Sequence, residues 1–161
     1  MGGNSYYIIA IHIFIMTTIS KFATRFAQID IPGQLPSIIE EVSPEAIAYN
    51  QQQLYRSSVN RFGKSLKQYQ SPSYALYKYR RNPLPGLGRP DLNLTGTLYR
   101  GMYLKVDSRS YLLGSYDVKE PKIEAKYGKD IWGLTRENKA RLARENVRPL
   151  LMGYIRNVAR I

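Results

Sequence analysis

The sequence predicts an α+β fold with one long N-terminal helix, a small antiparallel β-hairpin and a C-terminal helix. Three observations predict it: apolar residues at helical spacing in the first half, two adjacent segments of alternating polarity, and a second helical stripe near the end. A chain of 161 residues is expected to form a single domain. We divide it into an N-terminal extended arm, residues 1–42, and an α+β domain, residues 43–161.

Residues 17–42 of the arm are expected to be extended or to form a short helix, because Pro32, Gly33 and Pro36 disfavour a long helix. Its apolar run at residues 6–16 has only eleven residues, whereas a helix that spans a bilayer needs about 20. We therefore predict no membrane span there, and interpret the β-branched run as a strand or a buried arm. An alternative is that Met16 is the natural first residue.

The long helix is expected to begin at Ser43-Pro44-Glu45 and to run to about Phe62. Serine can cap a helix, proline suits the first helical position and an acidic residue complements the helix dipole. Gly63 follows at a position suited to ending the helix.

A long loop is predicted at residues 64–94, which are rich in Pro, Gly, Tyr and Arg and show no sustained period. Loops of this length are uncommon in compact domains and are usually functional, so we expect this one to become ordered against a partner. Its aromatic and basic residues alternate, which suits either a protein interface or a surface for single-stranded nucleic acid. We favour the interface, and the predicted contact residues are Tyr74, Tyr77, Tyr79, Arg80 and Arg81.

The β-hairpin is predicted by alternation on both sides of a turn-forming segment at residues 107–110. In the first strand Met102, Leu104 and Val106 share one face. A connection at residues 117–134 follows. Thr135 is then expected to cap a helix that ends near Val147, with Pro149 separating it from a last helical segment.

The composition leaves little material for catalysis. The chain has no cysteine and a single histidine, His12, so thiol chemistry and multi-histidine metal sites are excluded. A serine nucleophile would lack its usual base. The glycines at Gly86 and Gly88 follow no predicted strand and lack a P-loop lysine. We therefore predict no enzymatic activity, no catalytic residue, no metal and no cofactor.

The charge balance instead points to binding. The formal net charge of +12 indicates contact with phosphates, an anionic membrane surface or an acidic protein; the alternative is a solvated surface whose basicity affects only solubility. Tyrosine is unusually frequent, with 14 residues, and it suits protein interfaces and base stacking alike. Composition alone does not choose between these partners.

The order of short motifs in residues 43–161 resembles a known family. A Leu-Thr-Gly-x-Leu turn leads into the hairpin, a Lys122–Gly128 segment follows, and a Gly-Leu-Thr sequence starts the closing helix. This order is similar to that of the tail-completion and virion-morphogenesis proteins of tailed bacteriophages, which are neck, head–tail connector or minor tail components. The residues that carry the resemblance are Leu94, Thr95, Gly96, Leu98, Gly133, Leu134 and Thr135.

The resemblance implies a structural subunit in a homo-oligomeric ring of six- or twelve-fold symmetry. The ring would join portal and head to tail around the DNA channel, with the portal and other neck or tail proteins as partners and non-specific contact with packaged DNA. It further implies synthesis in the bacterial host cytoplasm, a place in the virion, and no membrane partner. The main alternative is a basic nucleic-acid-binding accessory protein; a third is an interfacial membrane protein that uses residues 6–16. On the ring hypothesis, deletion of residues 68–93 is expected to leave a folded domain that no longer assembles.

Overall fold

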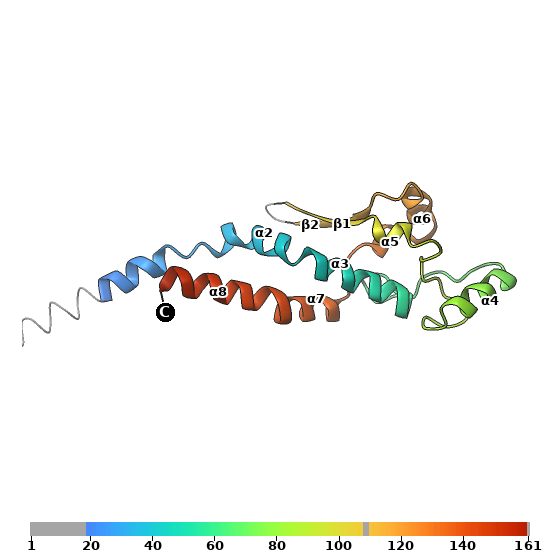
Figure 1. Cartoon of the computed structure of the whole chain (residues 1–161), viewed down its shortest axis with the longest axis horizontal. Coiled ribbons are helices and arrows are strands. Elements are labelled where there is room, and N and C mark those ends of the chain that lie inside the picture. The colour runs from blue at the N-terminus through green and yellow to red at the C-terminus, as the bar shows by residue number, and fades with distance from the viewer. Residues whose placement is uncertain (1–18, 108–109, 161) are drawn as a thin grey trace, which may run out of the picture.

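A computed structural model of the chain describes residues 19–107 and 110–160. The apolar run at residues 6–16, Met16 and His12 lie outside the described residues. The described part is elongated, with helices running along its length and a two-stranded sheet on one flank (Figure 1).

Two helices that follow one another form the centre. They are α2 (Ile31–Glu41) and α3 (Ser43–Gln52), which continues into the π-helical turn η1 (Gln53–Ser57). Helix α2 packs against α8 (Arg148–Ala159) on one side and against β1 (Met102–Val106) on the other. Figure 1 shows the same order, with the hairpin on one side of α2 and α8 on the opposite side.

The prediction of one long helix from residue 43 to Phe62 is therefore wrong at both ends. The chain is helical from Ile31, with a break at Val42, and Ser43 does not cap because no side-chain hydrogen bond is made at that start. The helical stretch ends at Ser58, which adopts a left-handed conformation with φ of 51°. The Asn60 side chain then accepts hydrogen bonds from the N–H groups of Phe62 and Lys64, which stabilises a turn instead of more helix.

The described part of the predicted arm is largely helical, in residues 19–27 and in α2, which corrects the extended arm and agrees with the short-helix alternative. Asp30 caps α2 by accepting a hydrogen bond from the Gly33 N–H at 2.9 Å, and Pro32 occupies the first turn, where no N–H is needed. Pro36 lies inside α2 and removes one intrahelical bond. Packing against α8 and β1 outweighs this local preference, because tertiary contacts supply most helical stability in proteins.

The predicted loop at residues 64–94 contains a ten-residue helix, α4 (Pro72–Arg81), so the loop prediction is wrong there. Ser71 caps it by accepting from the Tyr74 N–H. The segment also adds buried residues to the fold, namely Leu66, Ala75, Lys78, Asn82, Pro85, Pro90 and Asp91. A deletion of residues 68–93 would remove most of these residues, so the structure favours a loss of stability over the folded remnant that we expected.

The hairpin prediction is confirmed. Strand β1 pairs antiparallel with β2 (Tyr111–Ser115), and Leu104 lies opposite Leu113. The short helix α5 (Thr97–Arg100) precedes the hairpin. The connection at residues 117–134 is more ordered than expected, since it contains α6 (Glu120–Tyr127) and the 3-10 turn η2 (Lys129–Ile131).

The C-terminal helix is confirmed, with one correction. Helix α7 (Arg136–Leu142) continues through the π-helical turn η3 (Ala143–Val147) into α8 without a gap, so Pro149 does not interrupt it. A proline ring clashes with the carbonyl four residues earlier in a regular α-helix, and the wider π turn just before Pro149 relieves such a clash.

Two apolar clusters form the core. The larger one lies between η1, the hairpin and the turn before Trp132, and it consists of Leu54, Leu66, Leu98, Met102, Leu113, Ile131 and Trp132. The smaller one joins α2, α3 and α7 through Val42, Ala46, Leu134 and Leu142. Leu104 of β1 packs against both clusters, so the hairpin ties them together.

Candidate functional site

The five predicted contact residues all lie on α4, which has one buried and one exposed side. Ala75 and Lys78 on this helix, and Asn82 just after it, are buried. The tyrosines and arginines of the prediction are exposed around the rest of the helix. The structure therefore supports an accessible surface at these positions, and it places them on a helix and not on a loop.

Three of these residues form a row along α4, which we call the tyrosine row: Tyr74, Tyr77 and Arg81. The Tyr74 and Tyr77 ring centroids are 6.1 Å apart. The Arg81 guanidinium lies 5.6 Å from the Tyr77 ring centroid and donates a hydrogen bond of 2.7 Å to the Tyr77 hydroxyl. Tyr79 and Arg80 are exposed on other parts of the helix surface and do not join the row.

A buried ion pair fixes α4 to the chain that follows it. Lys78 Nζ lies 2.6 Å from Asp91 Oδ1, and the two side chains are only 4% and 3% exposed. Both groups have further partners: the ammonium donates to the Asn93 carbonyl, and the carboxylate accepts from the Asn93 N–H and from Asn82 Nδ2. We call this arrangement the ion-pair contact. Its complete set of partners offsets the cost of burying two charges.

The ion-pair contact also affects nearby tyrosines. The Tyr99 hydroxyl donates to the Asp91 carbonyl at 2.5 Å. Burial, and next the Asp91 carboxylate, raise the pKa of Tyr99 and of Tyr69 above the ordinary value, and they raise the pKa of Tyr127 to about 12. All three phenols therefore stay protonated at neutral pH and act as neutral rings with a hydroxyl donor.

The motif residues of the resemblance divide into two groups. Gly133, Leu134 and Thr135 are framework residues: the Gly133 carbonyl accepts hydrogen bonds from Asn50 Nδ2 and Gln53 Nε2, both at 2.8 Å. The Thr135 N–H donates to Gln53 Oε1, and the Thr135 hydroxyl caps α7 by accepting from the Asn138 N–H. We call the contact of Asn50 and Gln53 with this segment the amide contact.

The second motif group, Leu94, Thr95, Gly96 and Leu98, lies at the start of α5. Gly96 has a φ of 76°, a left-handed conformation that favours glycine, and it serves as the N-cap of α5. Leu98 is buried in the larger core cluster, whereas Leu94 is exposed. All four residues line a pocket of about 310 Å³.

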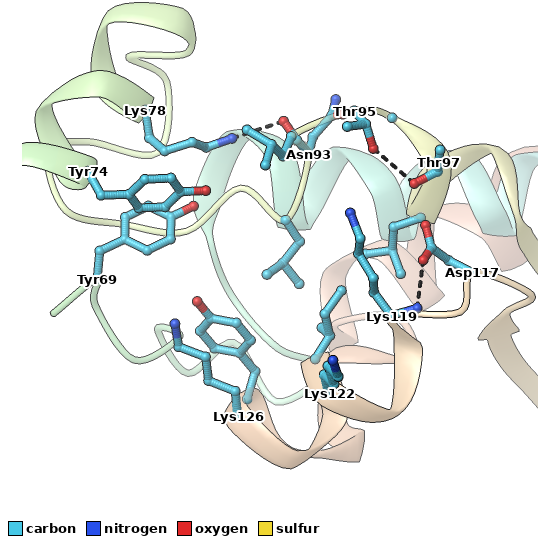
Figure 2. A pocket seen from close by; sticks show the side chains of 16 residues that line it. Tyr69, Tyr74, Lys78, Asn93, Thr95, Thr97, Asp117, Lys119, Lys122 and Lys126 are labelled. Atoms are coloured by element: carbon cyan, nitrogen blue, oxygen red, sulfur yellow. Dashed lines mark hydrogen bonds between the residues drawn. The ribbon is translucent and has the colours of Figure 1, made fainter. Parts of the chain in front are cut away.

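That pocket lies between α4 and its preceding segment, α5 and α6 (Figure 2). Leu92, Leu98 and Ile123 supply apolar walls. Tyr69, Tyr74 and Tyr127 add aromatic rings, with the Tyr69 and Tyr74 centroids 4.9 Å apart in an edge-to-face arrangement. The basic residues at its rim are Lys119, Lys122 and Lys126. We call this site the lysine–tyrosine pocket.

Sequence reasoning missed this pocket and the ion-pair contact. The spacing of Lys119, Lys122 and Lys126 places them on one helical face, and this was the available signal, but residues 117–134 were interpreted as a connection. Lys78 and Asp91 gave no such signal, because each reads as a solvated charge until the fold brings them together.

The described residues hold neither a metal-type cluster nor a membrane-length helix. No group of three or more His, Cys, Asp or Glu side chains is arranged to hold a metal ion in residues 19–107 and 110–160. Within the same ranges, no helix is both long and apolar enough to cross a bilayer.

Comparisons of the chain with protein-family models, with curated proteins and with solved structures find no match. Membership of the tail-completion family therefore stays a prediction from the motifs of residues 43–161, and it is taken up below as a proposal.

Proposed function

We propose that this chain is a structural subunit of an oligomeric ring in the neck or tail of a tailed bacteriophage, joining head to tail around the DNA channel. We propose further that its role is to hold neighbouring proteins in position and not to catalyse a reaction. The observation that carries the proposal is the distribution of exposed apolar side chains. They lie on separate parts of the molecule, as a subunit with two different neighbours requires.

The first apolar surface is at the N-terminal end of the described chain. Phe22 and Phe26 in the helical residues 19–27 stack with centroids 5.9 Å apart, yet Phe26 is 48% exposed. Ile19 on the same helix is also exposed. Figure 1 shows this helix projecting beyond the body of the molecule. A projecting apolar helix gains most of its stability from contact with another surface.

The second apolar surface is at the hairpin and the segment after it. Leu112, Tyr116 and Val118 are exposed, the last two by 71% and 89%. This surface comes from different elements than the first. A head-to-tail ring contact joins two different patches on each subunit, whereas a two-fold dimer uses the same patch twice. Exposed apolar side chains also occur elsewhere, at Phe62, Leu84 and Leu87. The presence of apolar surfaces on different elements supports a ring more than a dimer.

The net charge of +12 supports the same proposal, because a subunit around a DNA channel meets phosphates or acidic neighbours. The first test is immunogold labelling of purified virus particles with an antibody against this chain. We expect label at the head–tail junction. Particles that lack the protein would overturn the proposal.

A second test separates assembly from folding. Phe26→Glu and Val118→Glu each place a charge on an exposed apolar site, so we expect folded monomers that are not incorporated into particles. Gln52→Glu, an exposed position on α3, is the matched control and should be incorporated normally. Normal incorporation of both apolar-site variants would contradict the assigned surfaces.

The alternative, a basic nucleic-acid-binding accessory protein, is favoured by one specific observation, the exposed tyrosine row of α4. Neighbouring exposed aromatic rings beside a cation suit single-stranded nucleic acid. This alternative predicts binding to free single-stranded DNA or RNA that weakens steeply with salt and is lost in Tyr77→Ala. The ring proposal predicts weak, non-specific binding that Tyr77→Ala leaves unchanged.

A further inference from the structure

The lysine–tyrosine pocket has the features of a ligand site and is independent of the ring proposal. Its volume of about 310 Å³ is at the lower end of the range of ligand pockets, roughly 300–1,000 Å³. Apolar walls with a few convergent polar groups are also typical of such sites.

The charges on α6 are sorted between two faces. Glu120 and Glu124 are used inside the protein, where Glu120 accepts from the Ser115 N–H and Glu124 from the Trp132 indole N–H. The three pocket lysines form no ion pair within residues 19–107 and 110–160. The acids next to them in sequence therefore do not neutralise them.

The other charged groups at the pocket do not cancel the positive charge of these three lysines. Lys78 also borders the pocket, but Asp91 neutralises it. Asp117 is the one acidic residue that lines the pocket among the described residues, and its Oδ1 accepts the Lys119 backbone N–H at 2.8 Å. Three ammonium groups thus face one carboxylate. An anion with two negative charges, such as a phosphate monoester, complements this arrangement.

The aromatic side of the pocket adds a second requirement. Figure 2 shows the Tyr69 and Tyr74 rings close together across the pocket from Lys119, with Lys126 below them. Lys126 Nζ is 5.9 Å from the Tyr69 ring centroid and 5.2 Å from the Tyr127 centroid. The rings and the lysines are thus parts of a single surface. A ligand that fills it has a flat ring system for the tyrosines and an anion for the lysines.

We propose that this pocket binds a nucleotide unit, with its base against Tyr69, Tyr74 and Tyr127 and its phosphate at Lys119, Lys122 and Lys126. Contact between the tyrosine rings and the base does not select one base, because every base has a π-face. Two kinds of ligand carry such a nucleotide unit: a free nucleoside monophosphate and the 5′-phosphorylated end of a nucleic acid. The experiment below distinguishes them.

The test is calorimetric titration of the full chain with adenosine monophosphate, adenosine, inorganic phosphate and a short 5′-phosphorylated single-stranded DNA. Adenosine monophosphate is expected to bind saturably and at least about tenfold more tightly than adenosine or phosphate alone, because only the nucleotide engages both halves of the pocket. Binding of the oligonucleotide as tightly as the mononucleotide, with loss of that binding when the 5′-phosphate is removed, identifies a nucleic-acid end as the source. Selective binding of the mononucleotide identifies the free nucleotide.

Matched variants assign the binding to this pocket. Lys122→Ala should weaken nucleotide binding by about tenfold, and Tyr74→Leu by about fivefold or more. The controls are Lys139→Ala on α7 and Tyr79→Leu on α4, both exposed residues outside the pocket, which should bind as the parent does. Circular dichroism confirms that each variant is folded.

Three results would overturn the proposal. The first is the absence of saturable binding by adenosine monophosphate. The second is binding no tighter than that of inorganic phosphate, which would leave the tyrosines without a role. The third is an equal loss of affinity in the pocket variants and their controls, which would indicate general attraction to a basic protein.

Discussion

The amide contact and the ion-pair contact are both buried and polar, but they differ in charge and in how far apart in the sequence the joined residues lie. The amide contact uses the neutral side chains of Asn50 and Gln53 to bind Gly133, which is 80 residues beyond Gln53 in the chain. The ion-pair contact uses Lys78 and Asp91, which belong to neighbouring stretches of the chain. The amide contact therefore joins the two halves of the fold, whereas the ion-pair contact orders one segment, α4 and the residues after it.

Both contacts are buried, but the loss of one partner has different consequences in each. A neutral amide that loses its partner leaves an unsatisfied dipole, while a buried charge that loses its partner leaves an uncompensated ion. Damage to the ion-pair contact should be larger in energy and local in extent. Damage to the amide contact should be smaller and should reach both halves of the molecule.

The largest expected effect is that of Asp91→Asn. It leaves the Lys78 ammonium buried without a counter-charge, so the free energy of unfolding should fall by about 3–5 kcal/mol. Chemical denaturation measures this loss. The matched control is Asp130→Asn, which breaks the exposed Arg61–Asp130 pair of 2.9 Å and should cost about 0–1 kcal/mol. Equal losses in the two variants would show that burial does not govern the ion-pair contact.

An intermediate effect is expected for Gln53→Ala. The variant removes one donor to the Gly133 carbonyl and the acceptor for the Thr135 N–H, at a cost of about 1–3 kcal/mol. Hydrogen exchange should increase in both α3 and α7, because the contact joins them. Gln52→Ala changes the exposed neighbour and should leave exchange unaltered. Faster exchange confined to α3 would contradict the claim that the amide contact stabilises both α3 and α7.

A smaller effect is expected at the start of α7. Thr135→Ala removes the hydroxyl that accepts from the Asn138 N–H and should destabilise the protein by about 1 kcal/mol. Thr135→Ser retains the hydroxyl, so it should recover most of the lost stability. Thermal unfolding of the three proteins measures the difference, and a serine variant as unstable as the alanine variant would exclude capping as the cause.

The smallest effect on stability is expected for Tyr127, whose ionisation changes the free energy of unfolding only at alkaline pH. Burial raises the pKa of Tyr127 from 10.0 to about 12, so the unfolded chain loses this proton at a lower pH than the folded chain. The stabilisation is complete below about pH 10 and is lost as the pH rises to about 12. Denaturation midpoints across this range should fall less steeply in Tyr127→Phe than in the parent. The exposed Tyr79→Phe is the control and should follow the parent.

Local features of the fold could be predicted because their causes lie within a few residues. The hairpin followed from alternating polarity around residues 107–110, and the α7 start followed from Thr135 as a cap. Helix α4 could not be found this way. Its buried side consists of a small residue, a lysine and an asparagine, so it carries no apolar stripe, and Lys78 is buried only because the fold supplies Asp91.

The same limit applies to the candidate site. The sequence identified the exposed tyrosines and arginines of α4, since aromatic and basic side chains suit contacts with a partner on a helix as well as on a loop. It did not identify the lysine–tyrosine pocket, which combines Tyr69 and Tyr74 with Lys119 and Lys126 from a later part of the chain. It also placed proline breaks where the structure has helix, at Pro36 and Pro149.

The sequence by itself thus determined the hairpin, the basic charge, the Thr135 cap and the aromatic residues of α4. Only the tertiary structure decided which charges are buried, how the proline-containing helices persist and which distant side chains share a pocket. The physical reason is that capping and alternation act over a few residues, whereas burial and ion pairing depend on neighbours that the chain supplies from far away.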